Sequence, residues 1–508
     1  MLVRIGCAIA LVFNLAHPAA AQAPASDVRH LTVEEAVRLS LENNLGIRVA
    51  RIDPQIQDLS VAQARAAWFP TLTSALQGAG TDSPSNSFLS GADTKTSDGR
   101  LSTNVGVAQT LPWGGSYNVG WDSVRSTTTN LFSNFSPQLR SSLALSYRQP
   151  LLRGFSIDSA RQQVLVTEKN REIADVSMRE TIALTSRAVR HAYWDLAFAI
   201  ASLRVQRQSL DLAAESLRNT RARIEIGTTA PVDAIEAEAE VAQREEAVVL
   251  GDAQIATAED ALRTLVYDPA AADFWTLRIE PADLPPFVPA VVNMDAAMRN
   301  ALEQRSDLQQ SRKNLEAQDV NIRYFHNQTL PDVTASIDYG LTGLGGTQFV
   351  RGAGFPGPII GQTERSFGTV LGDLFGNDFP SWTASLNVSY PIGANPQEAA
   401  LARTRMEYNQ QQTQLRSAEL QVAAQVREAG RQMVTNQRRV ETTTISRQLS
   451  ERRLDAEERK LAAGTSTSFF VFQAQRDLAE ARNNELRATI DYQRSIVDFE
   501  TVQEAPLR

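Results

Sequence analysis

The chain has 508 residues, and its 58 Asp and Glu against 50 Lys and Arg give a formal net charge of −8. Apolar residues make up 43% and charged residues 21%, a composition that excludes a disordered chain, a collagen and a disulfide-rich scaffold. Because no basic surplus exists to neutralise phosphates, we expect no nucleic-acid partner.

The first 23 residues have the pattern of a secretory signal peptide. An arginine precedes an apolar run over residues 5–15, and small residues follow, among them Ala21 and Ala23. We predict that residues 1–23 are removed together with Cys7, the single cysteine, so that the mature chain has no thiol. The alternative is a buried N-terminal helix. No later stretch approaches 18 uninterrupted apolar residues, and we therefore expect no later membrane-spanning helix.

The chain contains an internal duplication. Leu31–Ile47 matches Val292–Leu308, and three further pairs of segments follow in the same order. These pairs are Phe69–Leu72 with Leu330–Val333, Gln149–Leu152 with Tyr390–Gly393, and Ile226–Thr228 with Ala463–Thr465. Four matches in one order predict two tandem repeats, residues 24–267 and 290–508, joined by a linker at 268–289.

Each repeat has the same predicted order: a helix ending near a proline, alternating strands, a second proline, a very long helix, a Gly-Thr turn and a returning helix. The strands are expected at about residues 71–149 and 332–390, and the turns near 227–231 and 464–468. The first repeat has the longer strand region, which predicts an additional hairpin with strands 105–111 and 116–124 around Pro112–Gly115.

The long helices carry a seven-residue repeat. Ile157–Ile226 contains neither Gly nor Pro, and as one helix it would reach about 105 Å. Its counterpart, Gln397–Ala463, has only Gly430. Apolar residues recur every seventh position at Val189, Leu196, Leu203, Leu210, Leu217 and Ile224, and at Val426, Met433, Val440, Leu454 and Leu461, with Arg447 as the exception. This period predicts that the helices supercoil left-handedly against partner helices; the alternative is an ordinary two-stranded coiled coil or a spectrin-like rod.

The strands have the two-faced pattern of outer-membrane strands. Residues 381–390 alternate between polar and apolar side chains, and aromatic residues flank the apolar face. The candidate aromatic girdle comprises Trp382, Tyr390, Tyr339 and Tyr147. A half-buried strand of a soluble sheet is the alternative. Gly343–Pro380, with ten glycines, is expected to be a long loop or a low-complexity linker. The four to six expected strands are too few for one chain to close a barrel, so we expect an oligomer.

Together these segments resemble the TolC-like outer membrane efflux family. The resemblance rests on LTVEEAVRLSLENN at 31–44, AWFPTL at 67–72, QPLLRG at 149–154, AYWDL at 192–196, and the turn sequences at 224–242 and 460–481. It implies a mixed, mainly α fold, in which long antiparallel helices form a coiled-coil barrel across the periplasm. It also implies a homotrimer in which each subunit gives four strands to a twelve-stranded barrel in outer-membrane lipid. The implied partners are a periplasmic adaptor (membrane fusion) protein and an inner-membrane transporter.

The two turns are the candidate sites. The resemblance makes the residues of the turns candidates for adaptor contact: Gly227, Thr228, Asp233, Gly464 and Thr465. The alternative is that the glycines only reverse the chain. The family's turn typically has an acidic residue six positions after the glycine. Asp233 fills this place in the first repeat, whereas Phe470 occupies it in the second.

This departure suggests a periplasmic gate made of Phe469, Phe470 and Gln473. Three copies of the aromatic pair would form an apolar constriction that closes by dewetting. The alternative is that both phenylalanines pack between helices. The sequence leaves open whether the gate is hydrophobic or polar.

The sequence carries no GxSxG, HExxH, Walker or CxxC pattern, and we therefore expect no enzyme, cofactor or metal site. The predicted function is a passive outer-membrane channel of a tripartite efflux pump or type I secretion system, extending into the periplasm. The alternatives are a structural coiled-coil protein of the envelope without a pore, and an autonomous porin. The cargo and the class of inner-membrane pump are not readable from the sequence.

Overall fold

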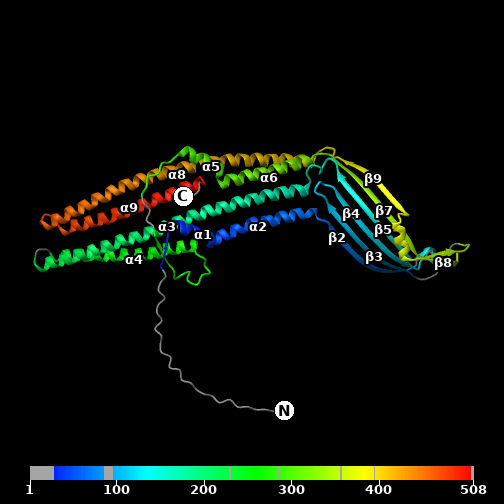
Figure 1. Ribbon diagram of the computed structural model, residues 1–508, viewed down its shortest axis with the longest axis horizontal. Helices are drawn as coiled ribbons and strands as arrows, with labels where there is room; N and C mark the ends of the chain where they lie inside the picture. Colours follow the sequence, from blue (N-terminus) through cyan, green and yellow to red (C-terminus); the bar gives the residue numbers. More distant parts are fainter. Residues whose placement is uncertain are drawn as a thin grey trace, which may run out of the picture. The chain divides into compact units, whose positions relative to one another are not determined.

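The computed structural model describes residues 28–84, 95–227, 230–282, 287–354, 357–393 and 395–504 (Figure 1). The predicted signal peptide and Thr228 lie outside these residues. The chain divides into two compact units. We call residues 1–45, 184–292 and 431–498 the helical unit, and residues 46–183, 293–430 and 499–508 the sheet unit.

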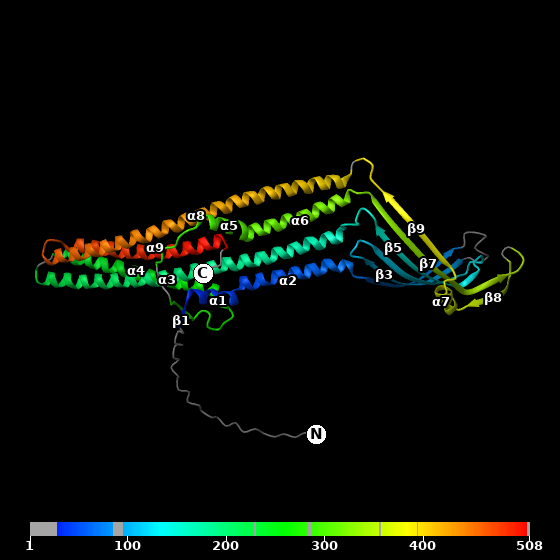
Figure 2. The same ribbon diagram turned by 45° about the horizontal axis from the view of Figure 1, so that its top comes forward.

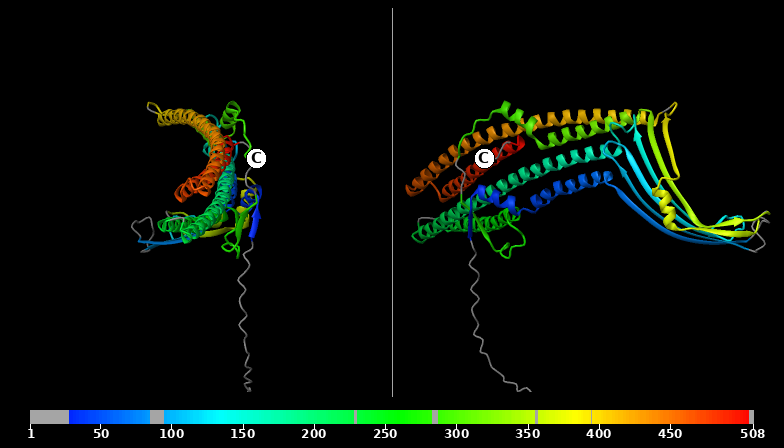
Figure 3. Two further views of the ribbon diagram at one scale, coloured as in Figure 1. Left: turned by 90° about the vertical axis from the view of Figure 1, so that its left-hand side faces the viewer. Right: turned by 45° about the vertical axis from the view of Figure 1, so that its right-hand side comes forward.

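The sheet unit contains one antiparallel sheet. Its strands are β2 (Thr71–Pro84), β3 (Lys95–Thr110), β4 (Ser116–Thr128), β5 (Phe135–Pro150), β7 (Asp332–Arg351), β8 (Ile359–Arg365) and β9 (Pro380–Ser389). The order runs from β2 through β3, β4 and β5 to β7, which pairs with both β8 and β9. The long strands curve in the same sense across the sheet (Figures 2 and 3).

Apart from α7, which precedes β9 at the other end, helices enter and leave this sheet at one end. The sheet unit holds most of α2 (Leu45–Arg65), η1 (Ala66–Trp68), α5 (Met294–Gln304), α6 (Ser306–Gln328), α7 (Phe367–Phe375) and the first parts of α3 (Ser159–Glu225) and α8 (Pro396–Ala462). Each change from helix to strand occurs at a proline, because proline cannot continue a ladder of helical hydrogen bonds. Pro70 precedes β2 and Pro331 precedes β7.

The helical unit is built around the second parts of α3 and α8. It adds α1 (Val33–Asn43), α4 (Val232–Val266), α9 (Ser468–Val502) and a two-stranded parallel sheet of β1 (Val28–Leu31) and β6 (Arg278–Pro281). Its main core includes Leu31, Tyr193, Leu196 and Leu262, all fully buried. The Tyr193 hydroxyl donates to the carbonyl oxygen of Leu31 at 2.9 Å, which fixes β1 against α3. Strand β6 lies inside the segment that connects the two repeats.

The element lengths confirm the two tandem repeats. Helices α1 and α5 each have 11 residues, α3 and α8 each have 67, and α4 and α9 each have 35. The predicted additional hairpin is present as β3 and β4, both longer than expected. The resemblance implies four strands for each chain, whereas the described chain has six long strands in one sheet. The difference arises because β3 and β4 are full members of the ladder.

The glycine-rich segment from Gly343 to Pro380 is not a loop, and the expectation of an irregular segment there is wrong for the described residues. It forms the end of β7, then β8 and α7. The glycines permit close packing: a Cβ at Gly345 would lie 2.5 Å from a methyl group of Val370 in α7. Val370 is fully buried as a result.

The seven-residue stripe lies on the buried side of the long helices. Val189, Leu196, Val426 and Val440 are 0–3% exposed. The exception, Arg447, forms ion pairs with Glu485 at 2.5 Å and with Glu451 at 3.0 Å. Among the helices of the described ranges, none is both long and apolar enough to cross a membrane.

Candidate functional site: the two faces of the sheet and the helical tips

One row of side chains crosses all six long strands on a single face of the sheet. The row consists of Leu72, Val107, Val119, Leu145, Tyr339 and Trp382, each paired with the next in the ladder. Side chains alternate between the two faces of a strand, so paired residues share a face. The next row on this face contains Val105, Trp121, Leu143 and Leu341. This apolar face suits contact with lipid.

The opposite face is polar. In β3 and β4 the Asn104 side chain donates to Asp122 at 2.5 Å, and in β7 and β9 the hydroxyls of Ser336 and Ser385 are 2.7 Å apart. A row of polar side chains can face only water or polar partners without a large cost. The two faces therefore have the chemistry expected of the outside and the lumen of a channel wall.

The four predicted girdle residues lie at different places on the apolar side. Tyr339 and Trp382 are directly paired, and Trp382 is 75% exposed. Tyr147 is paired with Tyr117 of β4, a partner that the sequence analysis did not single out. Tyr390 follows the end of β9 and is half exposed. The structure thus joins Tyr339 to Trp382 in one pair and does not pair Tyr390 with any of the other three within the described residues.

Strands β2 and β9, at the two ends of the ladder of long strands, are the most exposed strands of the sheet. Within the described residues, β2 pairs only with β3, and β9 pairs only with β7 and not with β8. Every residue of β2 and nine of the ten residues of β9 are exposed. A long edge strand presents unpaired backbone donors and acceptors that another strand can pair with.

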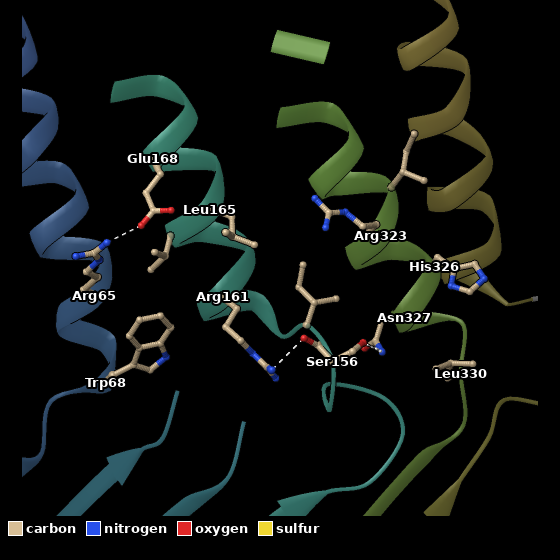
Figure 4. Close-up of a pocket in the computed structure, with 13 residues that line it drawn as sticks. Arg65, Trp68, Ser156, Arg161, Leu165, Glu168, Arg323, His326, Asn327 and Leu330 are labelled. Atoms are coloured by element: carbon tan, nitrogen blue, oxygen red, sulfur yellow. Dashed lines mark hydrogen bonds and ion pairs between the residues drawn. The ribbon is translucent and has the colours of Figure 1, made fainter. Parts of the chain in front are cut away.

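A hollow of about 980 Å³ lies where α2, α3 and α6 meet the sheet (Figure 4). Its cationic side chains already have partners: Arg65 pairs with Glu168 at 2.6 Å, and Arg161 donates to the carbonyl oxygens of Phe155 and Ser156 at 2.8 and 3.0 Å. These bonds fix the start of α3 beside the end of α2. This junction could not be predicted from the sequence, because its residues come from both repeats and share no local motif.

The first helical tip joins α3 to α4 in the helical unit. Gly227 has a φ of 77°, and a Cβ there would have nothing within 4 Å. This glycine is required by the left-handed backbone and not by crowding. Asp233 lies in the first turn of α4, where its charge favours the positive end of the helix dipole.

The second tip joins α8 to α9. Gly464 has a φ of 73°, and the Thr465 amide donates to the carbonyl oxygen of Lys460 at 2.9 Å, which caps the end of α8. Glu457 accepts from Lys460 at 2.7 Å and from Ser466 at 2.8 Å. These two hydrogen bonds, the one from Lys460 foremost, hold the pKa of Glu457 below its ordinary value.

The predicted gate residues lie at the start of α9. The rings of Phe469 and Phe470 meet edge to face with centroids 5.6 Å apart, and the side chains are 50% and 51% exposed. The next two residues, Val471 and Phe472, are buried instead. Gln473 does not join the aromatic pair; it donates to Asp477 one turn further on, at 2.9 Å.

Within the described residues, no group of three or more His, Cys, Asp or Glu is placed to hold a metal ion. The polar side chains described above form ion pairs and hydrogen bonds with one another and with the backbone. The described residues present one apolar sheet face, one polar sheet face and two helical tips.

Comparison with family models matches residues 36–266 and 297–501 to the outer membrane efflux protein family. The two matched ranges lie within the two predicted repeats and cover most of the sequence, so the chain belongs to this family. A search among curated proteins finds no match.

Solved structures of the same fold are outer-membrane channels. The channel OprN gives a TM-score of 0.65 at 15% identity, with 93% of this chain and 90% of that chain covered. CmeC of Campylobacter jejuni gives a TM-score of 0.64 at 14% identity, with 93% of this chain and 85% of that chain covered. MtrE of Neisseria gonorrhoeae, in its open state, gives a TM-score of 0.63 at 16% identity, with 93% of this chain and 88% of that chain covered.

The chain is an outer-membrane efflux channel of the kind used in tripartite pumps. Members of the family are outer-membrane channels that extend into the periplasm, form trimers and work with a periplasmic adaptor and an inner-membrane pump. The recognition of the family and of its mainly helical fold from the sequence is confirmed.

Proposed function

We propose that three copies of this chain form a passive duct through the outer membrane. Cargo enters from an inner-membrane transporter through a periplasmic adaptor and leaves at the cell exterior. The observation that carries this proposal is the two-faced sheet, whose exposed edge strands leave it open in a single chain. A membrane channel requires every backbone group of its wall to be paired, and copies of the chain provide the missing partners.

The proposal is tested by imaging and fractionation. The mature protein, extracted from outer membranes in detergent, is expected to give particles with threefold symmetry in negative stain. A monomeric particle, or recovery in the soluble periplasmic fraction, would support the non-pore coiled-coil alternative. Channel activity in cells without any adaptor would support the autonomous porin.

We propose that the helical tips contact the adaptor. Each tip is built on an exposed glycine with a left-handed backbone, Gly227 or Gly464, and Asp233 and Thr465 lie close to them along the chain. We expect Asp233→Arg and Thr465→Arg to abolish efflux while outer-membrane level and trimer content stay at the wild-type value. Glu364→Arg, on β8 far along the chain from either tip, is the control. Normal efflux by both tip variants would contradict a contact there.

We further propose that the exposed pair Phe469 and Phe470 narrows the entrance of the trimer, with Gln473 behind it. An apolar ring excludes water and ions when it is narrow. We expect the double variant Phe469→Ala/Phe470→Ala to raise the conductance of reconstituted trimers several-fold. Phe375→Ala removes a more exposed phenylalanine from α7, 76% exposed, and is expected to leave conductance unchanged. Equal conductance of the double variant and the wild type would refute the gate.

We propose that residues 1–23 direct export and are then removed. The pattern of a charged start, an apolar run and small residues supports this proposal. Sequencing the N-terminus of the outer-membrane form is expected to give a start after Ala21 or Ala23. An intact Met1 in that fraction would contradict it.

A further inference from the structure

The first repeat contributes two strands that have no long counterpart in the second repeat. Strand β2 follows Pro70 as β7 follows Pro331, and β5 and β9 each lead to a proline before a 67-residue helix. Between these equivalent strands the second repeat has the short β8 and α7, whereas the first has β3 and β4. The question is whether this hairpin lies in the channel wall or outside it.

The ladder places the hairpin inside the sheet. Strand β3 pairs with β2 from Lys95 to Ala108, and β4 pairs with β5 from Ser116 to Ser126. The two strands also pair with each other over 13 residues without a bulge. Within the described sheet, β2 is therefore connected to β5 only through this hairpin.

The hairpin has the same two faces as the neighbouring strands. Val107 and Val119 belong to the apolar row that begins at Leu72 and ends at Trp382. Asn104 and Asp122 belong to the polar face and bond to each other. A hairpin lying outside the membrane would have no reason to continue an apolar stripe in register with its neighbours.

The turn of the hairpin reaches the helical end of the sheet. The Trp113 indole donates to the Tyr147 hydroxyl of β5 at 3.4 Å, and the Gln109 amide donates to the carbonyl oxygen of Trp68 at 2.7 Å. Gly114, with a φ of 90°, lies so close to the start of α3 that a Cβ would be 2.7 Å from the carbonyl oxygen of Gly154. The turn of the hairpin therefore lies at the end of the sheet where the helices enter, and its second strand, β4, runs alongside β5.

Six strands also satisfy the direction rule for closure. Every neighbouring pair among the long strands is antiparallel, so with an even number of strands β2 and β9 run in opposite directions. Identical copies placed side by side then meet as an antiparallel pair, β9 of one copy against β2 of the next. An odd number would force a parallel seam.

We infer that all six long strands are wall strands, so that the trimer closes a barrel of eighteen strands in place of the twelve implied by the resemblance. This inference rests on the proposed trimer. Because barrel diameter grows roughly in proportion to strand number, the wall would be about 1.5 times as wide as a twelve-stranded one. Barrels of this size leave an aqueous channel.

The test uses single cysteines and a charged maleimide that cannot enter lipid or detergent. Matched neighbours compare the two faces of each inserted strand: Val105→Cys with Asn104→Cys on β3, and Val119→Cys with Asn118→Cys on β4. We expect the two asparagine positions to be labelled at least ten times faster than the two valine positions in assembled trimers. Leu145→Cys and Ser146→Cys on β5 provide the reference for a wall strand.

Fast labelling of both members of each inserted pair, with a normal contrast on β5, would overturn the inference and leave the trimeric channel intact. Absence of trimers in the wild type would instead defeat the proposed function. Should a cysteine variant fail to assemble, end-on images of the wild-type trimer decide the matter. An eighteen-stranded wall is expected to measure about 35 Å between opposite strand axes, and a twelve-stranded one about 24 Å.

Discussion

At the scale of single residues, one buried hydroxyl ties the connection between the repeats to the helical unit. Tyr492 is fully buried; its hydroxyl donates to the carbonyl oxygen of Val288 at 3.0 Å and accepts from the Ala290 amide at 2.9 Å. We expect Tyr492→Phe to destabilise the protein by about 1 kcal/mol, because two partly buried hydrogen bonds are lost. Thermal unfolding in detergent measures the change.

The matched control for this prediction is Tyr390→Phe, which removes a hydroxyl from a half-exposed ring at the end of β9. Its effect is expected to stay within about 0.5 kcal/mol. Equal melting temperatures for the two variants would show that the connection contributes nothing to stability through Tyr492.

Single residues also show what the sequence could predict. Alternation alone predicts that Trp382 lies on an apolar face, and the ladder pairs it with Tyr339, a partner that alternation does not identify. The partners of Tyr492 and Arg65 were not predictable, because both contacts join segments more than a hundred residues apart. A local sequence period identifies the face of a helix or strand on which a residue lies. It does not identify the residue that contacts it from another segment.

At the scale of elements, Gly430 marks a close contact within the sheet unit. It is the one glycine of α8, where glycine costs about 1 kcal/mol relative to alanine. A Cβ at this position would collide with the terminal methyl of Met294, at the start of α5, and lie 3.4 Å from the ring of Phe499. We expect Gly430→Val to destabilise the protein by no more than about 1 kcal/mol, because the colliding methyl is the movable end of the Met294 side chain.

The contact predicts a specific rescue. Met294→Ala removes the colliding methyl and should restore most of the stability lost in Gly430→Val, as measured by thermal unfolding of the double variant. If Met294→Ala and Gly430→Val were simply additive, the packing explanation for this glycine would be wrong.

Helices α3 and α6 are joined by a four-residue ion-pair network. Lys313 contacts Glu172 and Lys169 contacts Glu316, both at 2.8 Å. The pKa of Glu172 is held below its ordinary value, chiefly by the hydrogen bond from Lys313 and in spite of burial. The same contact raises the pKa of Lys313. The carboxylates therefore add stability above their unfolded pKa and lose it as the pH falls; the lysines lose theirs only at strongly alkaline pH.

The directions of these pKa shifts predict how the stability of the protein depends on pH. Because these side chains are 27–45% exposed, we expect Glu172→Gln to cost no more than about 1 kcal/mol at pH 7. The difference from the wild type should shrink as the pH falls below about 4 and the carboxylate is protonated. Glu246→Gln, at an exposed position on α4, is the control. A difference that persists at pH 3 would contradict an electrostatic origin.

Elements also differ in how readily the sequence reveals them. The long helices were predictable because a period of seven persists over many turns, and its one exception, Arg447, is compensated by ion pairs. Helix α7 was not, because its glycine-rich surroundings have the composition of a loop. Strand β2 carries only Leu72 and Leu76 as large apolar residues over 14 positions, so its length could not be read from alternation.

At the scale of the whole molecule, assembly requires β2 of one copy to pair with β9 of the next. Both strands are exposed and run in opposite directions, and a heterologous contact of this kind closes into a ring when the rotation between copies is regular. Removal of the predicted signal would leave the mature chain without cysteine, so introduced cysteines report only on the engineered contact. Leu76→Cys on β2 and Leu386→Cys on β9 both lie on the apolar face.

We expect the double variant, or one shifted by two residues along β9 to Val388→Cys or Ala384→Cys, to form covalent dimers and trimers on oxidation. Paired strands bring Cβ atoms within about 5.5 Å, close enough for a disulfide in a favourable register. Each single variant, and Val119→Cys combined with Leu386→Cys, should remain uncrosslinked because β4 lies inside the sheet. Denaturing electrophoresis under non-reducing conditions gives the result. Monomers from every register, despite intact trimers in native conditions, would mean that the copies associate through their helices and that the sheet edges are not the seam.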